Sequence, residues 1–101
     1  MASNIFYGQK TVSANTVAEQ LTTTAFRAYV VTIKALAGNN GWIYVGDASV
    51  SSSNGFVLDA GEEVTLFVDN VDTDIFIISS VNGEGVSFIG WVDRSILYQD
   101  E

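Results

Sequence analysis

Carboxylates are the side chains of this sequence that come closest to a catalytic set. The 101 residues include 12 Asp and Glu but no histidine and no cysteine, although catalysis at neutral pH mostly uses His, Cys or a tuned carboxylate pair. A Ser-His-Asp arrangement is therefore excluded, and zinc and redox metals lack their usual ligands. Glycosidase chemistry would need two acids across a cleft, and the candidates are Glu19, Glu62, Glu63 and Glu84.

We interpret these four glutamates as solvated charges, because so short a chain rarely forms a deep sugar-binding cleft. We therefore predict that the protein is not an enzyme, that it has no catalytic residue and that it uses no cofactor and no catalytic metal.

Oxygen-bearing side chains alternate in one short segment, Asn70-Val71-Asp72-Thr73-Asp74. The spacing resembles the start of an EF-hand calcium loop, but Ile75 stands where that loop requires a glycine. The segment is more typical of a polar turn with Asx hydrogen bonds, and a loose calcium site in the acidic loop Asp69–Asp74 stays open. Glycine clusters such as Asn82–Gly85 match no phosphate-binding pattern and indicate hairpin turns.

Short strands separated by Gly, Asn, Asp and Ser would position these side chains. The strongest candidate, Ala28–Leu36, is followed by a turn and by Trp42–Gly46, which together predict a β-hairpin. Glu63–Val68 alternates, with Val64, Leu66 and Val68 inward and Phe67 outward. The apolar run Ile75–Ser79 is typical of a strand covered on both faces, and Val86–Val92 is expected to pair back on it.

The pattern as a whole predicts one all-β domain over residues 1–101, a small antiparallel β-sandwich or barrel of about seven or eight strands. The serine-rich loop Asp47–Gly55 is the expected flexible element. Apolar residues near both ends, where a lone domain would fray, suggest an N-terminal (1–8) and a C-terminal (93–101) docking arm.

The composition contains more apolar material than a small domain can bury. Hydrophobic residues make up 48% of the chain and charged residues 16%, against an average of about 25% charged. A domain of this length has a large surface relative to its core, so part of this apolar surface is expected to face a partner. The net charge of −8 repels phosphate backbones and anionic membranes, so we expect neither a nucleic-acid nor a membrane partner.

Apolar residues fall on both faces of several predicted strands, whereas the outer faces of a free sandwich should be polar. Interfaces between proteins favour aromatic residues, and burial by barrel closure or by covering loops is the alternative for each side chain. The predicted interface residues are Phe6, Tyr7, Trp42, Tyr44, Phe67, Ile89, Trp91, Leu97 and Tyr98.

Four segments resemble small proteins encoded in the structural regions of tailed-phage genomes. They are Val31–Asn39 (VTIKALAGN), Trp42–Gly46 (WIYVG), Asn54–Val64 (NGFVLDAGEEV) and Val86–Trp91 (VSFIGW), and the similarity spans roughly residues 10–92. The resemblance implies a β-sandwich virion component of the head decoration, or cement, kind. Tryptophan at positions 42 and 91 is bulkier than this family's pattern leads us to expect.

On this resemblance we expect a capsid decoration protein that stabilises the phage head by binding between major capsid subunits. The expected partners are the major capsid protein and copies of this chain, with a trimer suited to three-fold positions. The expected location is the capsid surface of the virion, after assembly in the host cytoplasm, since residues 1–8 do not resemble a signal peptide. The alternative is a tail, baseplate or fibre component, with exposed aromatics that bind glycans.

Overall fold

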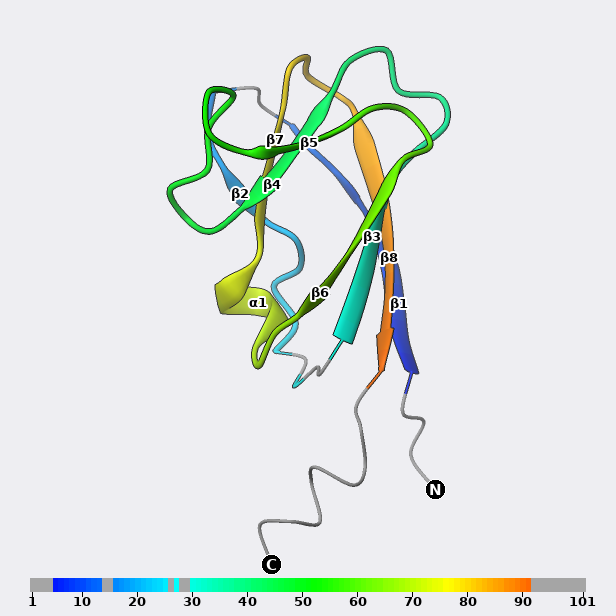
Figure 1. The fold of residues 1–101 in the computed structure, drawn as a ribbon, viewed down its shortest axis with the longest axis vertical. Helices are drawn as coiled ribbons and strands as arrows, with labels where there is room; N and C mark the ends of the chain where they lie inside the picture. The colour runs from blue at the N-terminus through cyan, green and yellow to red at the C-terminus, as the bar shows by residue number, and fades with distance from the viewer. Residues whose placement is uncertain (1–4, 14–15, 26, 28–29, 92–101) are drawn as a thin grey trace, which may run out of the picture.

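The chain forms two antiparallel four-stranded sheets that pack face to face (Figure 1), and the computed structural model describes residues 5–13, 16–25, 27 and 30–91. Sheet A has the strand order β1 (Ile5–Thr11), β8 (Gly85–Trp91), β3 (Val30–Ala35) and β6 (Glu63–Phe67). Sheet B has the order β2 (Glu19–Gln20), β7 (Phe76–Ser79), β4 (Ile43–Gly46) and β5 (Phe56–Leu58). The predicted all-β fold of about seven or eight antiparallel strands is confirmed, and of the two predicted architectures, sandwich and barrel, the described residues form the sandwich.

The core between the sheets follows from the two-residue period of the strands. Val31, Ile33 and Ala35 alternate along β3 and are fully buried, as the alternation in the sequence predicts. Ile43, Val45 and Ile77 face them from sheet B, and one cluster joins both sets with Phe6, Val86 and Phe88. β6 also follows its predicted phase, with Val64 and Leu66 packed against the core and Phe67 exposed.

The prediction of two hairpins is wrong, because the strands expected to pair with each other lie in different sheets. The predicted pairs were Ala28–Leu36 with Trp42–Gly46 and Ile75–Ser79 with Val86–Val92. β3 pairs with β6 and β8, whereas β4 pairs with β5 and β7, so the segment between β3 and β4 crosses from one sheet to the other. The turn between β7 and β8 also crosses between the sheets. Alternation fixes which side chains point inward, but it does not specify the partner strand.

Asn39 connects one of these crossovers to sheet A. Its side-chain amide donates to the carbonyl oxygen of Gly85 at 2.9 Å, and its side-chain oxygen accepts from the N–H of Gly85 at 2.9 Å. Beside it, the buried carboxylate of Glu84 accepts from the N–H of Asn40 at 2.8 and 3.0 Å. These bonds hold the turn that follows β3 against the start of β8.

We predict that Asn39→Ala lowers the free energy of unfolding by about 1–3 kcal/mol, because it removes the acceptor of the Gly85 N–H and one of the two donors to the Gly85 carbonyl, which keeps its bond from the N–H of Leu36. Urea denaturation measures this change. The matched control is Asn40→Ala, because Asn40 bonds through its backbone and its side chain is exposed, and it should change stability by less than about 0.5 kcal/mol. Equal losses for the two variants would contradict this role for Asn39.

The loop Asp47–Gly55, which the sequence suggested as a flexible element, covers part of the outer face of sheet B. Val50 packs against Tyr44 and Ile78, and all three are buried. Hydrogen bonds within the loop hold this arrangement, including those from the N–H of Val50 to the Asp47 carbonyl and from the N–H of Gly55 to the Ser51 carbonyl, both at 2.9 Å. β7 is therefore covered on both faces, as its continuous apolar run predicts.

The acidic segment before β7 contains α1 (Val71–Asp74), a single helical turn with Val71 buried in the core. No helix among the described residues is long and apolar enough to cross a lipid bilayer.

Candidate interaction surface

Five large apolar side chains share the outer face of sheet A, and we call this set the apolar face: Ile5, Tyr7, Phe67, Ile89 and Trp91. The strand register brings them together in two adjacent rows. One row crosses the sheet as Ile5, Trp91, Val30 and Phe67, and the next as Tyr7, Ile89, Thr32 and Thr65. Segments from three distant parts of the sequence therefore contribute to one continuous surface.

The apolar face is strongly exposed. Tyr7 is 75% exposed and Phe67 is 73% exposed, while Ile5, Ile89 and Trp91 have 46–53% of their surface open. Val30 is almost fully buried between Trp91 and Phe67 and forms the floor of the first row. A contiguous apolar patch on a soluble domain is typical of an interaction site, whereas single exposed apolar residues are ordinary.

The other half of the same sheet face is polar. The row after Tyr7 and Ile89 consists of Gln9, Ser87, Lys34 and Glu63. The apolar face is therefore limited to the end of the sheet where β8 and β6 finish. Thr32 and Thr65 mark its border, and their hydroxyls bond to each other at 2.8 Å, which leaves few polar groups of the sheet directed at a ligand.

Four of the predicted interface residues lie on the apolar face: Tyr7, Phe67, Ile89 and Trp91. Phe6 is a correction, because its side chain points inward and packs in the core against Phe88, with ring centroids 6.3 Å apart. Tyr44 is also buried, under Val50 of the loop that covers sheet B. Leu97 and Tyr98 lie outside the described residues, as do residues 1–4 and 93–101 of the two expected arms.

Trp42 is half exposed but does not belong to the apolar face. It lies three residues after Asn39, which bonds to Gly85 at the start of β8, whereas Trp91 is at the other end of that strand. The two tryptophans are therefore about 20 Å apart along a seven-residue strand. They do not form one site.

Ile5 and Val30 belong to this surface, although neither was in the predicted set. Ile5 was assigned to an N-terminal arm, but residues 5–8 are part of β1 and pair with β8. Only the pairing of β1 and β3 with β8 places Ile5 and Val30 beside Trp91, so no local signal in the sequence could have identified them.

Three of the four glutamates considered for catalysis make hydrogen bonds or an ion pair within the fold. Glu19 forms an ion pair with Lys10 at 2.7 Å and accepts from the N–H of Ser13 at 2.9 Å. Glu62 accepts from the N–H of Asp59 at 2.8 Å within the turn before β6, and Glu84 is the buried acceptor described above. Glu63 is exposed in the polar row of sheet A.

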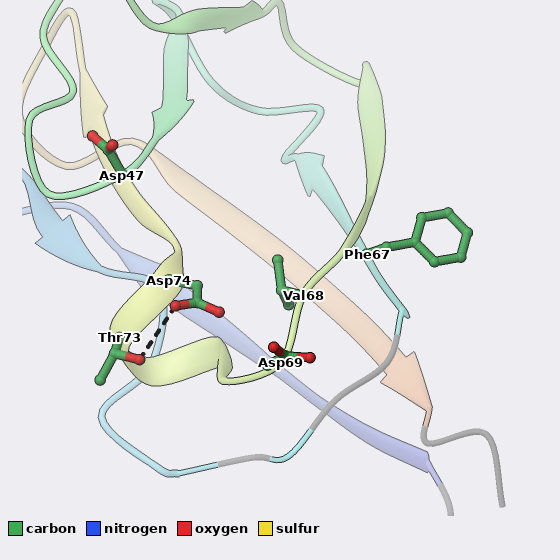
Figure 2. A pocket seen from close by; sticks show the side chains of 6 residues that line it. All are labelled: Asp47, Phe67, Val68, Asp69, Thr73 and Asp74. Carbon is green, nitrogen blue, oxygen red and sulfur yellow. Dashed lines mark hydrogen bonds between the residues drawn. The ribbon is translucent and has the colours of Figure 1, made fainter. Parts of the chain in front are cut away.

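An acidic pocket of about 460 Å³ lies next to the end of β6, lined by Asp47, Phe67, Val68, Asp69, Thr73 and Asp74. In Figure 2 the ring of Phe67 points away from the carboxylates of Asp69 and Asp74. The carboxylate of Asp74 accepts from the N–H of Asn70 at 3.1 Å and from the hydroxyl of Thr73 at 3.4 Å. Among the described residues, no three His, Cys, Asp or Glu side chains converge to hold a metal ion.

Comparisons with protein-family models, with curated proteins and with solved structures found no match for this chain.

Proposed function

We propose that this protein is a structural subunit that binds other protein subunits through the apolar face, as a capsid decoration or cement protein of a tailed phage. The observation that carries the proposal is the contiguous exposure of Tyr7, Phe67, Ile89 and Trp91 on one end of sheet A. In sheet B, in contrast, the loop Asp47–Gly55 covers Tyr44 and Ile78 of the outer face, and Val57 beside them is 46% exposed.

A protein partner fits this surface best. Fully covering one large apolar side chain is worth roughly 1.5–3 kcal/mol, and the five side chains of the apolar face are about half to three-quarters exposed. Covering them all would therefore contribute several kcal/mol before the costs of association. Tyr, Trp and Phe are also the residues that protein interfaces concentrate at their centres.

The capsid setting is supported by the resemblance of Val31–Asn39, Trp42–Gly46, Asn54–Val64 and Val86–Trp91 to small phage structural proteins. A modest contact would be sufficient there, because many symmetric copies on one shell bind with avidity. The net charge of −8 would lie on the solvent side and oppose non-specific association.

A glycan-binding tail or fibre component is the second candidate. Tyr7 and Trp91 are diagonal neighbours on adjacent strands, because Tyr7 is opposite Ile89 and Ile5 is opposite Trp91, so both rings could stack on a sugar. Sugar recognition also needs polar side chains beside the rings. Gln9 is two residues from Tyr7 on the same face, whereas the hydroxyl of Thr32, which is diagonal to Trp91, bonds to Thr65. The loop Asp47–Gly55 packs on Tyr44 through Val50.

The test is to locate the protein on virions of the phage that carries its gene. An antibody against the purified protein, viewed in negative stain, should label the head evenly. Label confined to the tail or its tip would replace the capsid proposal with the second candidate. Virions without any label, from preparations in which the protein is detected in the infected cell, would refute both.

A further inference from the structure

A second apolar site lies along the open side of the sandwich, and we call it the edge groove. It has a volume of about 420 Å³ and is lined by Val45, Gly46, Phe56, Val64, Leu66, Val68, Asp74 and Ile75. β6 is an edge strand of sheet A and β5 is an edge strand of sheet B, so the groove follows the line where the two sheets do not meet. Val64, Leu66 and Val68 point inward but remain partly exposed.

We propose that the edge groove binds the C-terminal segment, residues 92–101, of a second copy of this chain. Residues 92–101 lie outside the described residues, so their sequence and reach carry the argument. The segment reads VDRSILYQDE, with three apolar residues in a row and no glycine or proline. In an extended segment Arg94, Ile96 and Tyr98 share one face and Leu97 points to the other.

The edge groove is long enough for Ile96 and Tyr98 to bind side by side along an extended segment. Val64 and Val68 are four residues apart along an extended strand, or about 13 Å, which accommodates the side chains of Ile96 and Tyr98 in succession. A segment that enters at Val68 and runs toward Val64 would be antiparallel to β6. This is the direction in which a short peptide can also pair with the free edge of a sheet.

The charge at the groove entrance fits the same register. Val68 and Asp74 line both the edge groove and the acidic pocket, in which Asp69 also lies. Arg94 is the basic residue of the C-terminal segment, and it precedes Ile96 by two residues, or about 7 Å. With Ile96 beside Val68, the guanidinium of Arg94 would lie against the carboxylates of Asp69 and Asp74.

The strand directions require that the segment comes from another copy. β6 and β8 both run antiparallel to β3 and therefore run parallel to each other, ending in the same row at Phe67 and Trp91. The chain leaves β8 in the direction opposite to the one in which the segment enters the groove. To reach its own groove it would have to reverse and also cross two strand spacings, about 10 Å, within the three residues from Trp91 to Arg94.

A contact between the C-terminal segment of one copy and the groove of the next is head-to-tail, and such contacts close into rings or continue as open chains. A closed ring of three would give the trimer expected for capsid three-fold positions. The proposed link between copies does not rest on the capsid proposal, because purified protein alone is sufficient to test it.

The test compares the mass of three proteins, each with residues 1–101, by light scattering. The wild type should be oligomeric, whereas Ile96→Asp/Tyr98→Asp, which alters the C-terminal segment, should have the monomer mass of 10.9 kDa. Phe56→Asp should also be monomeric, because it places a charge on the groove wall at a residue that is 58% exposed. If Phe56→Asp fails to fold, Val68→Glu is the replacement. The control Leu97→Asp changes the opposite face of the segment and should keep the wild-type mass.

Mixing the two monomeric variants provides the decisive measurement. Each retains what the other has lost, so one intact segment and one intact groove should form a 1:1 dimer of twice the monomer mass. A mixture that stays monomeric overturns the proposal, since it would mean that the segment and the groove do not bind each other. A monomeric wild type at the highest soluble concentration, or a segment variant that keeps the wild-type mass, also overturns it.

Discussion

Trp91→Ser is expected to weaken binding to capsids by about 30-fold to 1,000-fold, which corresponds to the 2–4 kcal/mol typical of an interfacial tryptophan. Trp91 lies in the row of the apolar face that runs from Ile5 to Phe67, next to the buried floor at Val30. Serine keeps the strand but removes the largest apolar side chain that a partner would cover. Co-sedimentation with capsids, over a range of protein concentrations, measures the loss of affinity.

The subunit itself should remain folded, because Trp91 is 46% exposed and contributes only part of its side chain to the domain. We expect a loss of about 1 kcal/mol in unfolding free energy, far below the cost of emptying a core site. If Trp91→Ser lowered the free energy of unfolding as much as the free energy of binding, Trp91 would contribute to the stability of the domain rather than to its interface.

Trp42→Ser is the matched control for this prediction. Trp42 is 50% exposed, close to the value for Trp91, but it lies at the opposite end of the molecule and outside the apolar face. The variant should bind capsids within about threefold of the wild type, as a surface change outside an interface does. If Trp42→Ser weakened binding as strongly as Trp91→Ser, the apolar face would not be the contact surface.

The apolar face was partly predictable from the sequence because it depends on alternation within single strands. Phe67 is out of phase with Val64 and Leu66, and Ile89 and Trp91 are out of phase with Phe88, so a two-residue period separates them from the core. Phe6 was harder to place because Ile5, Phe6 and Tyr7 are all apolar. In a run of consecutive apolar residues, the sequence does not show which of the alternating positions point into the core.

Tyr44 and Trp42 illustrate a different limit. Both are aromatic and lie two residues apart, on the same side of an extended chain, and the sequence gives no reason to separate them. The loop after β4 folds back and covers Tyr44 with Val50, and Gly55 permits this close approach because a Cβ there would lie 2.6 Å from the Cβ of Tyr44. The burial of Tyr44 therefore depends on a tertiary contact, which neither the composition nor the two-residue period of the strands predicts.

Gly90→Ala is expected to lower the free energy of unfolding by about 3 kcal/mol, the upper end of the usual cost of overpacking a core. Gly90 lies on the inner side of β8, in register with Phe6 and Val31. A Cβ at this position would be 2.6 Å from the carbonyl oxygen of Val30 and closer still to the ring of Phe6. Because one of the two neighbours is backbone, a simple rotation of a side chain cannot relieve both contacts.

Thermal unfolding measures this prediction, and a loss of about 3 kcal/mol should lower the Tm by roughly 12–24 °C in a domain of this size. Gly38→Ala is the control, because a Cβ there meets no atom within 4 Å and Gly38 is not one of the glycines with positive φ. It should change the Tm by less than about 3 °C.

Gly90→Ala is also expected to affect the apolar face, although Gly90 itself faces the core. Gly90 stands between Ile89 and Trp91 in the sequence, and the absence of a side chain lets the ring of Phe6 pack directly beneath this part of β8. If Gly90→Ala displaces the strand, the outward positions of Ile89 and Trp91 shift with it. We therefore expect Gly90→Ala to weaken capsid binding even at temperatures at which it is fully folded. Unchanged stability would show that Phe6 and β8 can separate at little cost, which contradicts the close packing of sheet A described above.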